Sequence, residues 1–298
     1  MSFVATLISH PTERALSAPL VDMASRLLNA TEKRWLSDAI ACDLLLAPGL
    51  RGSEIEAIAA GLRRELAAER VDLIVQPSEG RAKRLLLADM DSTMIDQECI
   101  DELADEVGLK EHVAAITARS MNGEIAFEPA LRERVALLKG LEIEVIDRII
   151  ASRITLASGG RELVATMREH GAWTALISGG FTAFTSRIAE RLGFDENRAN
   201  RLLQEDGRLL GKVAEPILGR EAKAAALLEI TARLGIGPDQ AIAVGDGAND
   251  LDMLALAGSG VALHAKPAVA EQARIRIDFG DLTALLFMQG YTQAQIVR

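Results

Sequence analysis

Two aspartates separated by one residue, Asp89 and Asp91, follow a short apolar run at residues 85–88. Because alternate residues leave a strand on the same side, both carboxylates can face one reacting group. One carboxylate can then attack as a nucleophile while the other exchanges protons with the leaving group. Acidic turns after strands are also common without any function, so this pair alone leaves both interpretations open.

A second acidic turn, Gly-Asp-Gly-Ala-Asn-Asp, follows the apolar run at residues 241–244. Its Asp246 and Asp250 offer carboxylate oxygens, and its glycines let the chain approach closely. Hard oxygen donors together with several waters suit Mg²⁺. Such a turn alone is usually only structural, but two acidic strand ends in one sheet predict a magnesium site.

Two further features could bind an anion. Ser178-Gly179-Gly180 follows the apolar run at 174–177, and a hydroxyl with backbone N–H groups at such a turn can cradle an anion, although most such turns are only loops. Lys223 lies on an alanine-rich predicted helix, where a lone lysine is usually solvated. The chain carries 33 basic and 43 acidic residues, a formal net charge of −10. Any anion site must therefore be built from local positive charge and backbone N–H groups, because two unit charges 4 Å apart interact by about 4 kcal/mol at an effective dielectric of about 20.

The predicted elements place these features at one edge of a parallel sheet. Strands are predicted at 85–88, 174–177 and 241–244, and helices at 160–170 and 221–234. Alternating strands and helices predict an α/β domain whose parallel sheet is covered on both faces. Ligands bind such sheets beyond the carboxyl ends of the strands. Residues 99–156 have a helical pattern without a strand run, which predicts a helical cap over that edge.

The first 80 residues show a different order of elements. Strands are predicted at 3–9, 34–37, 41–46 and 71–76, and helices at 18–28 and 54–68. Two such βαβ halves predict a small ferredoxin-like α+β domain. Ser53 is the expected N-cap of the second helix. Residues 77–80 form a predicted linker, so the expected domains are 1–80 and 81–298.

Composition excludes several classes of protein. The chain is 49% hydrophobic and 26% charged, without a basic cluster for nucleic acid or an apolar run long enough to span a membrane. Residues 1–9 lack a secretory leader, and Cys42 and Cys99 form no disulfide framework. We therefore expect a cytoplasmic protein without nucleic-acid or membrane partners, in which both cysteines act as small hydrophobes.

Taken together in chain order, the motifs DMDST, ISGGF, a lysine and GDGAND resemble those of the haloacid dehalogenase (HAD)-type phosphohydrolases. Residues 89–97, 121–127 and 131–139 extend the resemblance to the phosphoserine phosphatases, over about residues 85–281. The resemblance implies a Rossmann-like core with a small helical cap at about 99–156 and an N-terminal ACT-like domain. It also implies Mg²⁺-dependent hydrolysis of O-phospho-L-serine to L-serine and phosphate through an aspartyl-phosphate, the last step of serine biosynthesis.

The same resemblance implies a role for each matched residue. Asp89 would be the nucleophile, and Asp91 would protonate the leaving oxygen and then deprotonate water. The implied Mg²⁺ ligands are the Asp89 and Asp246 side chains and the Asp91 carbonyl, supported by Asp250. The implied phosphate contacts are Ser178, Gly179, Lys223 and Asn249, with Gly180 in support. From the cap, Glu98 would face the substrate ammonium and Arg134 its carboxylate, while Met121 and Phe127 would line the apolar part.

Other functions remain open from the sequence. Glu98 and Arg134 could form only a surface ion pair, worth under about 1 kcal/mol. The chain could instead act on a related metabolite, transfer the phosphoryl group to an alcohol, or bind an amino acid as a regulator without catalysis. The intact set of Asp89, Asp91, Lys223 and Asp246 argues against the last of these. A homodimer is compatible with the sequence, which gives neither the oligomeric state nor a preference between phospho-L- and phospho-D-serine.

Overall fold

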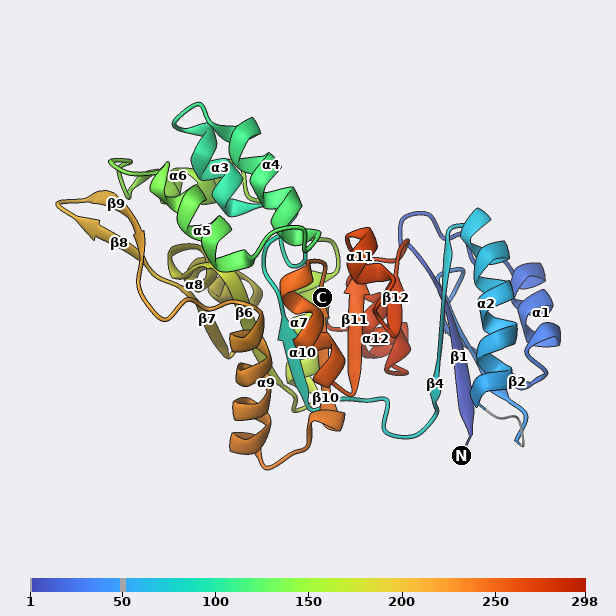
Figure 1. The fold of residues 1–298 in the computed structure, drawn as a ribbon. Helices are drawn as coiled ribbons and strands as arrows, with labels where there is room; N and C mark the ends of the chain where they lie inside the picture. The colour runs from blue at the N-terminus through green and yellow to red at the C-terminus, as the bar shows by residue number, and fades with distance from the viewer. Residues whose placement is uncertain (1, 49–51) are drawn as a thin grey trace. The chain divides into compact units, whose positions relative to one another are not determined.

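The computed structural model describes residues 2–48 and 52–298 (Figure 1). The chain forms two compact units, one of Met1–Lys83, Ser158–His170 and Ile275–Arg298, the other of Arg84–Ala157 and Gly171–Arg274. The predicted division between residues 80 and 81 stays a prediction, and the structure adds two later segments to the first unit. Among the described residues, no helix combines the length and apolar character that crossing a membrane requires.

The first unit is built on an antiparallel sheet with the strand order β2-β3-β1-β4. Its elements in chain order are β1 (Phe3–Ser9), α1 (Ala18–Leu27), β2 (Ala30–Ser37), β3 (Ala41–Leu46), α2 (Gly52–Ala68) and β4 (Val71–Pro77). This βαββαβ order fits the predicted ferredoxin-like domain. Apolar side chains from the sheet and both helices, among them Leu7, Leu44 and Leu62, form its core.

Several predicted boundaries in this unit differ from the structure. The strand predicted at 34–37 begins earlier, at Ala30. Helix α2 begins at Gly52, so Ser53 lies in its first turn and is not the N-cap; helix ends often differ from prediction by one or two residues. Pro77 belongs to β4 and pairs opposite Phe3, so the predicted linker loses its first residue. A proline is tolerated at this position because it ends the strand on the edge of the sheet.

Further elements of the first unit come from later in the chain. They are α7 (Gly160–Glu169), β12 (Ile275–Ile277), α12 (Ala284–Met288) and η3 (Gln293–Gln295). The Asp72 carboxylate on β4 accepts hydrogen bonds from the backbone N–H groups of Asp278 (2.8 Å), Phe279 (3.1 Å) and Gly280 (2.8 Å). The amide of Gln76 donates to the Met288 carbonyl at 2.6 Å. These buried and partly buried bonds explain why the last segment packs with the first.

The second unit contains a parallel sheet, as the sequence predicts. Its strands lie in the order β11-β10-β5-β6-β7. They are β5 (Leu85–Ala88), β6 (Trp173–Phe181), β7 (Glu196–Asn200), β10 (Ala241–Gly245) and β11 (Ser259–Leu263). The chain turns to opposite sides of β5 to form β6 and β10, and such a switch of direction opens a crevice at the carboxyl ends. Sequence reasoning missed β7 and β11, because Glu196–Asn200 is polar and Ser259–Leu263 has only a short apolar run.

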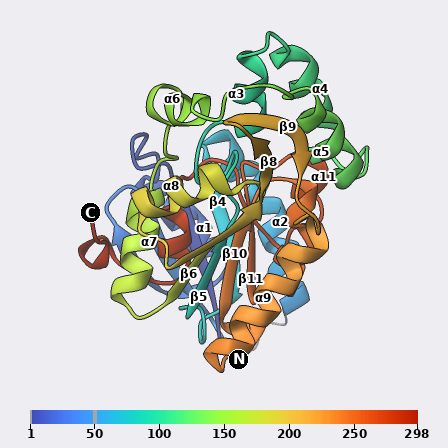
Figure 2. The same cartoon turned by 90° about the vertical axis from the view of Figure 1, so that its left-hand side faces the viewer.

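Helices cover both faces of this sheet. They are α8 (Thr182–Leu192), α9 (Arg220–Leu234), η1 (Pro238–Gln240), η2 (Ala248–Asp250), α10 (Leu251–Leu256) and α11 (Pro267–Ala270). Leu85 and Leu87 pack with Leu227 of α9 and Met253 of α10. Helix α8 packs against β6 and β7, and Figure 2 shows it across the strands from α9.

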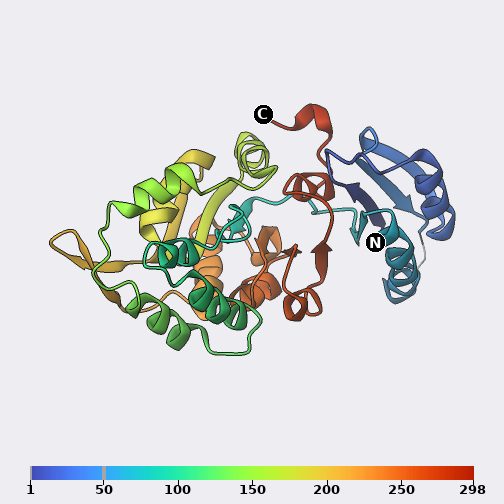
Figure 3. The same ribbon diagram turned by 90° about the horizontal axis from the view of Figure 1, so that it is seen from above.

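The predicted cap is present. Residues 99–156 form four helices, α3 (Cys99–Asp105), α4 (Lys110–Met121), α5 (Phe127–Ala136) and α6 (Val145–Ser152), and no strand. They lie beyond the arrowheads of the parallel strands in Figure 1, and Figure 3 looks down on them. An unpredicted hairpin of β8 (Leu202–Glu205) and β9 (Arg208–Val213) packs against α5. The cap therefore covers the sheet edge that carries the predicted motifs.

Candidate active site

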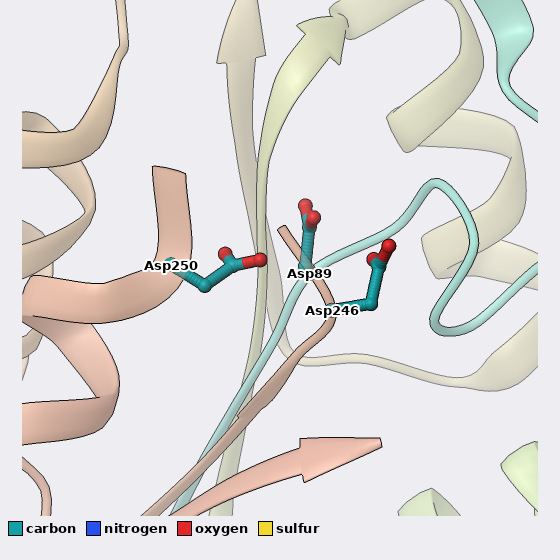
Figure 4. A group of neighbouring side chains, drawn as sticks. All are labelled: Asp89, Asp246 and Asp250. Atoms are coloured by element: carbon teal, nitrogen blue, oxygen red, sulfur yellow. The ribbon is translucent and has the colours of Figure 1, made fainter. Parts of the chain in front are cut away.

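Three buried carboxylates meet at the carboxyl ends of β5 and β10. These strands pair side by side up to Ala88 and Val244, so Asp89 and Asp246 emerge next to each other. Asp250 follows in η2, and oxygens of all three carboxylates lie within 4.8 Å of one another (Figure 4). Residue 245 must be a glycine for this arrangement, because a Cβ atom there would lie 2.3 Å from Cγ of Asp250.

Lys223 is fully buried in this cluster. Its ammonium group lies 2.6 Å from Oδ1 of Asp89 and 2.7 Å from Oδ1 of Asp250. Burial alone would lower the pKa of Lys223, but the charges of Asp250 and Asp89 outweigh it and raise the pKa above its ordinary value. The alternative of a solvated lysine is therefore wrong, and a fixed positive charge stands beside Asp89.

One lysine does not balance three carboxylates. Burial, followed by the charge of Asp250, raises the pKa of Asp89 well above its ordinary value and that of Asp246 to about 6. Apart from the ammonium groups of Lys223 and Lys266, the buried oxygens Oδ1 of Asp89 and Oδ2 of Asp246 have no hydrogen-bond donor among the described residues. Oδ2 of Asp246 lies 3.3 Å from the Lys266 ammonium. Three buried carboxylates whose oxygens lie this close together are a donor set that fits a hard divalent cation, so the cluster could hold one.

Asp91 is held in a different environment. Its Oδ1 accepts the Cys99 N–H at 2.8 Å, and its Oδ2 accepts the Ser178 hydroxyl at 3.3 Å. Burial raises the pKa of Asp91, against the opposing effect of the Cys99 N–H. A Cβ atom on Gly180 would come within 2.7 Å of Oδ2 of Asp91, so this glycine leaves the carboxyl its space. Two neighbouring aspartates with different surroundings are suited to different steps of one reaction.

The Ser178–Gly180 segment lies within β6 and does not form the predicted turn after the strand. Pairing with β7 is irregular between Ile177 and Phe181, which explains how the segment departs from a regular strand. The Ser178 hydroxyl accepts the Gly180 N–H at 2.8 Å. Such a local side-chain bond replaces the missing sheet contact and holds the hydroxyl beside Asp91.

Asn200 at the end of β7 supports this segment, and sequence reasoning missed it. Its amide donates to the carbonyls of Gly179 (2.8 Å) and Leu218 (3.1 Å), and its carbonyl oxygen accepts the Leu218 N–H at 2.7 Å. Leu218 lies two residues before the first residue of α9, the helix that carries Lys223. The buried amide thus joins the glycine segment to the lysine helix. No sequence signal pointed to it, because β7 itself has no apolar pattern.

A pocket lies between these groups and the cap. Ten of the predicted site residues line it: Asp89, Asp91, Glu98, Met121, Phe127, Arg134, Ser178, Gly179, Gly180 and Asn249. The other three, Lys223, Asp246 and Asp250, are buried in the carboxylate cluster beside it. Phe127 crosses closely over the glycine segment, where a Cβ atom on Gly179 would lie 2.7 Å from its ring. The structure therefore brings all thirteen predicted residues to one place.

Glu98 and Arg134 do not form the surface ion pair considered above. Arg134 is only 2% exposed, and the hydrogen bonds that these two described residues make go to other partners. Glu98 accepts the Ser92 hydroxyl at 2.8 Å. Burial raises the pKa of Glu98 to about 8, with a further contribution from Asp91, and burial lowers the pKa of Arg134. An acidic side chain, Glu98, and a basic one, Arg134, thus line one pocket without forming an ion pair with each other, and a zwitterion could lie between them.

Comparison with known proteins agrees with this geometry. A family model described as haloacid dehalogenase-like hydrolase matches residues 86–255. A relative named phosphoserine phosphatase, from Archaeoglobus fulgidus, is 45% identical over 75% of this chain and 65% of its own length. Another of that name, from Streptomyces coelicolor, is 41% identical over 82% of this chain. The chain spans 65% and 60% of the length of these two relatives.

Two solved structures are also similar. One, described as a phospho-aspartyl intermediate analogue of phosphoserine phosphatase, is 42% identical with a TM-score of 0.66; the match covers 69% of this chain and 98% of that one. The other is a HAD family hydrolase from Salmonella enterica serovar Typhi, 30% identical with a TM-score of 0.82. It covers 97% of this chain and 98% of its own. The second similarity therefore extends over both units.

Proposed function

The chain belongs to the haloacid dehalogenase-like hydrolases, and from that premise we propose that it hydrolyses O-phospho-L-serine to L-serine and phosphate. One observation carries the proposal: the pocket that exposes Asp89 and Asp91 also holds Glu98 and Arg134 on its cap side. Phosphoserine has a phosphate, an ammonium and a carboxylate, and the pocket offers a group for each. The names of the relatives support the same substrate.

In the first step, Asp89 attacks the phosphorus atom. A bond forms between its carboxylate oxygen and phosphorus, and the bond from phosphorus to the seryl oxygen breaks. Asp91 donates its proton to that leaving oxygen, a role that its raised pKa favours. Lys223, 2.6 Å from Asp89 Oδ1, holds the nucleophile in place and offsets the negative charge of the incoming phosphate.

In the second step, water attacks the phosphorus atom of the aspartyl-phosphate. Asp91, now ionised, accepts the proton from that water, and the bond between phosphorus and the Asp89 oxygen breaks. Phosphate leaves and Asp89 is regenerated. The Ser178 hydroxyl, the Gly179 N–H and Asn249 would bind the phosphoryl oxygens through both steps, because phosphoryl transfer depends mainly on in-line positioning and charge stabilisation.

The metal would be Mg²⁺, held by the Asp89 and Asp246 carboxylates and the Asp91 carbonyl, and Asp250 would support these ligands from nearby. When bound, Mg²⁺ supplies two positive charges that allow the anionic nucleophile to approach the phosphate. With Lys223 the positive charge is three, against one each from Asp89, Asp246 and Asp250 and about two from the phosphate. The site without the ion would carry an unfavourable excess of negative charge.

Substrate choice rests on the cap. The Arg134 guanidinium would bind the substrate carboxylate, and Glu98 would accept from its ammonium group. Met121 and Phe127 supply the apolar wall between them and the reacting centre. Binding of the whole amino acid would exclude water from the phosphoryl group, as required for attack by Asp89 rather than by solvent.

A phosphate-release screen tests the proposal. Phospho-L-serine, phospho-D-serine, phosphothreonine, sugar phosphates and p-nitrophenyl phosphate are compared with and without Mg²⁺, and with an added alcohol as acceptor. We expect the highest kcat/KM for phospho-L-serine, and only with the metal. A higher kcat/KM for a sugar phosphate, or transfer to the alcohol in place of hydrolysis, would establish one of the alternatives instead.

The remaining expectations stay proposals. The protein would act in the cytoplasm in the last step of serine biosynthesis, and its first 80 residues would form an ACT-like domain that senses an amino acid. A homodimer is an expectation that light scattering of the purified protein can test.

A further inference from the structure

Arg134 is the end of a chain of three side chains, each from a different cap helix. Asp101 lies on α3, Thr117 on α4 and Arg134 on α5. The Thr117 hydroxyl donates to Oδ1 of Asp101 at 2.7 Å, and it accepts from Nη1 of Arg134 at 2.9 Å. A second bond fixes the guanidinium, because its Nε donates to the Ala130 carbonyl at 3.0 Å.

The hydroxyl is suited to this position by its chemistry. A threonine hydroxyl has one proton and two lone pairs, so it can donate to the carboxylate while it accepts from the arginine. Its donation has one competitor, the Val113 carbonyl at 3.0 Å, which is farther away than Asp101. Thr117 is 3% exposed, so water does not substitute for either bond.

Because Thr117 lies between Asp101 and Arg134, the guanidinium of Arg134 stays available to bind a ligand carboxylate. A carboxylate in direct contact would occupy the guanidinium fork, as in ordinary arginine–carboxylate pairs. Here the hydroxyl separates them, so Asp101 acts on Arg134 only as a nearby negative charge. No hydrogen bond or ion pair among the described residues engages Nη2 of Arg134. Arg134 is one of the residues that line the pocket.

We propose that Thr117, held by Asp101, is a positioning residue that aims Arg134 into the pocket and thereby makes the enzyme selective for phosphate esters that carry a carboxylate. The inference rests on the proposed function, in which Arg134 binds the substrate carboxylate. It adds that this arginine is oriented by the α3–α4–α5 contact and not by its own helix alone. A substrate without a carboxylate gains nothing from the arrangement.

Thr117→Val tests the proposal, because it removes the hydroxyl at almost unchanged shape. We expect kcat/KM for phosphoserine to fall about 10- to 100-fold, mainly through KM, the factor typical of a weakened charge-assisted hydrogen bond. Hydrolysis of p-nitrophenyl phosphate should stay within about twofold. Thr117→Ser, which keeps the hydroxyl, should restore most of the activity on phosphoserine.

Thr231→Val is the matched control. Thr231 is also a buried helical threonine, and its hydroxyl donates to the Leu227 carbonyl one turn earlier at 2.8 Å. Loss of the Thr231 hydroxyl should change the hydrolysis rate of neither substrate, since Thr231 does not line the pocket. If Thr117→Val does not fold, Asp101→Ala is measured instead. The ratio of kcat/KM for phosphoserine to kcat/KM for p-nitrophenyl phosphate should again decrease.

Arg134→Ala separates failure of the inference from failure of the proposed function. If Arg134→Ala impairs phosphoserine selectively but the Thr117 and Asp101 variants do not, the positioning role is wrong and the carboxylate contact stands. If Arg134→Ala impairs both substrates equally, the proposed carboxylate contact itself is wrong. If Thr117→Ser behaves like Thr117→Val, the hydroxyl is not the determinant and the inference is overturned.

Discussion

Replacing Lys223 by methionine is the most informative single perturbation of this site. The lysine side chain is fully buried and lies between two carboxylates, at 2.6 Å from Asp89 and 2.7 Å from Asp250. Methionine keeps much of its volume and removes its charge. Because the remaining carboxylates are buried too, solvent does not replace the lost ammonium.

The magnitude follows from the geometry. Removing one partner of a buried ion pair costs about 3–5 kcal/mol, because it leaves an uncompensated charge in the interior. We therefore expect Lys223→Met to lower the free energy of unfolding by about 3 kcal/mol in the absence of divalent ions. Loss of an oriented positive charge beside the reacting group should also lower kcat about 10²- to 10³-fold.

Two measurements check these values. Urea unfolding, followed by tryptophan fluorescence in buffer containing a chelator, gives the change in stability. Steady-state hydrolysis of phosphoserine with Mg²⁺ gives the change in kcat. Lys266→Met is the control, because Lys266 is 34% exposed and lies 3.3 Å from Asp246. A partly exposed pair of this kind should contribute less than about 1 kcal/mol.

Equal losses of stability and kcat in Lys223→Met and Lys266→Met would contradict this prediction. If Lys223→Met unfolds at the same urea midpoint as the wild type, the three carboxylates need no compensating charge. Wild-type kcat in Lys223→Met would mean that the ammonium group does not take part in phosphoryl transfer, whatever its distance from Asp89. Either result would remove the electrostatic basis of the proposed mechanism.

Three further predictions concern other residues. Asp89→Asn should abolish labelling of the protein by radioactive phosphoserine with Mg²⁺ present, and normal labelling would refute the nucleophile assignment. Asn200→Ala should release the Gly179 carbonyl and weaken inhibition by inorganic phosphate about tenfold, in line with about 1–3 kcal/mol for an unsatisfied buried group; unchanged inhibition would limit Asn200 to a structural role. Burial raises the pKa of Asp72 from 3.8 to about 6, against opposing backbone N–H groups of 278–280. Because the folded state then binds a proton more tightly than the unfolded state, the stabilising contribution is greatest below about pH 4 and is lost as pH rises through 6. Urea midpoints should therefore show wild type gaining stability relative to Asp72→Asn between pH 7 and pH 5, and an equal difference at both values would contradict this.

Much of the fold was predictable because its signals are local. Apolar runs such as residues 85–88 end at acidic residues, and burial on both faces of a parallel sheet produces that pattern. The cap helices were predictable for the same reason, from a helical period without a strand run. Strand β7 was not, since its sequence is polar and its position is decided by pairing with β6. The hairpin of β8 and β9 likewise depends on packing against α5.

The sequence alone determined which side chains are the candidates for the chemistry. Asp89 and Asp91 lie two residues apart beside a strand, and Asp246 follows another, so their convergence needs only that the strands be parallel. The matched motifs added Lys223, Ser178 and the cap residues, and the structure brings them to the same pocket. Their roles remain proposals that the experiments above decide.

Only the tertiary structure decided how these side chains are held. The burial of Lys223 between two carboxylates, the bonds of Asn200, and the chain from Asp101 through Thr117 to Arg134 all join residues from separate elements. Sequence periodicity reports which face of an element is buried, but not which side chain lies opposite across a contact. Hydrogen bonds and ion pairs act over about 3 Å, so they depend on the register with which the elements pack.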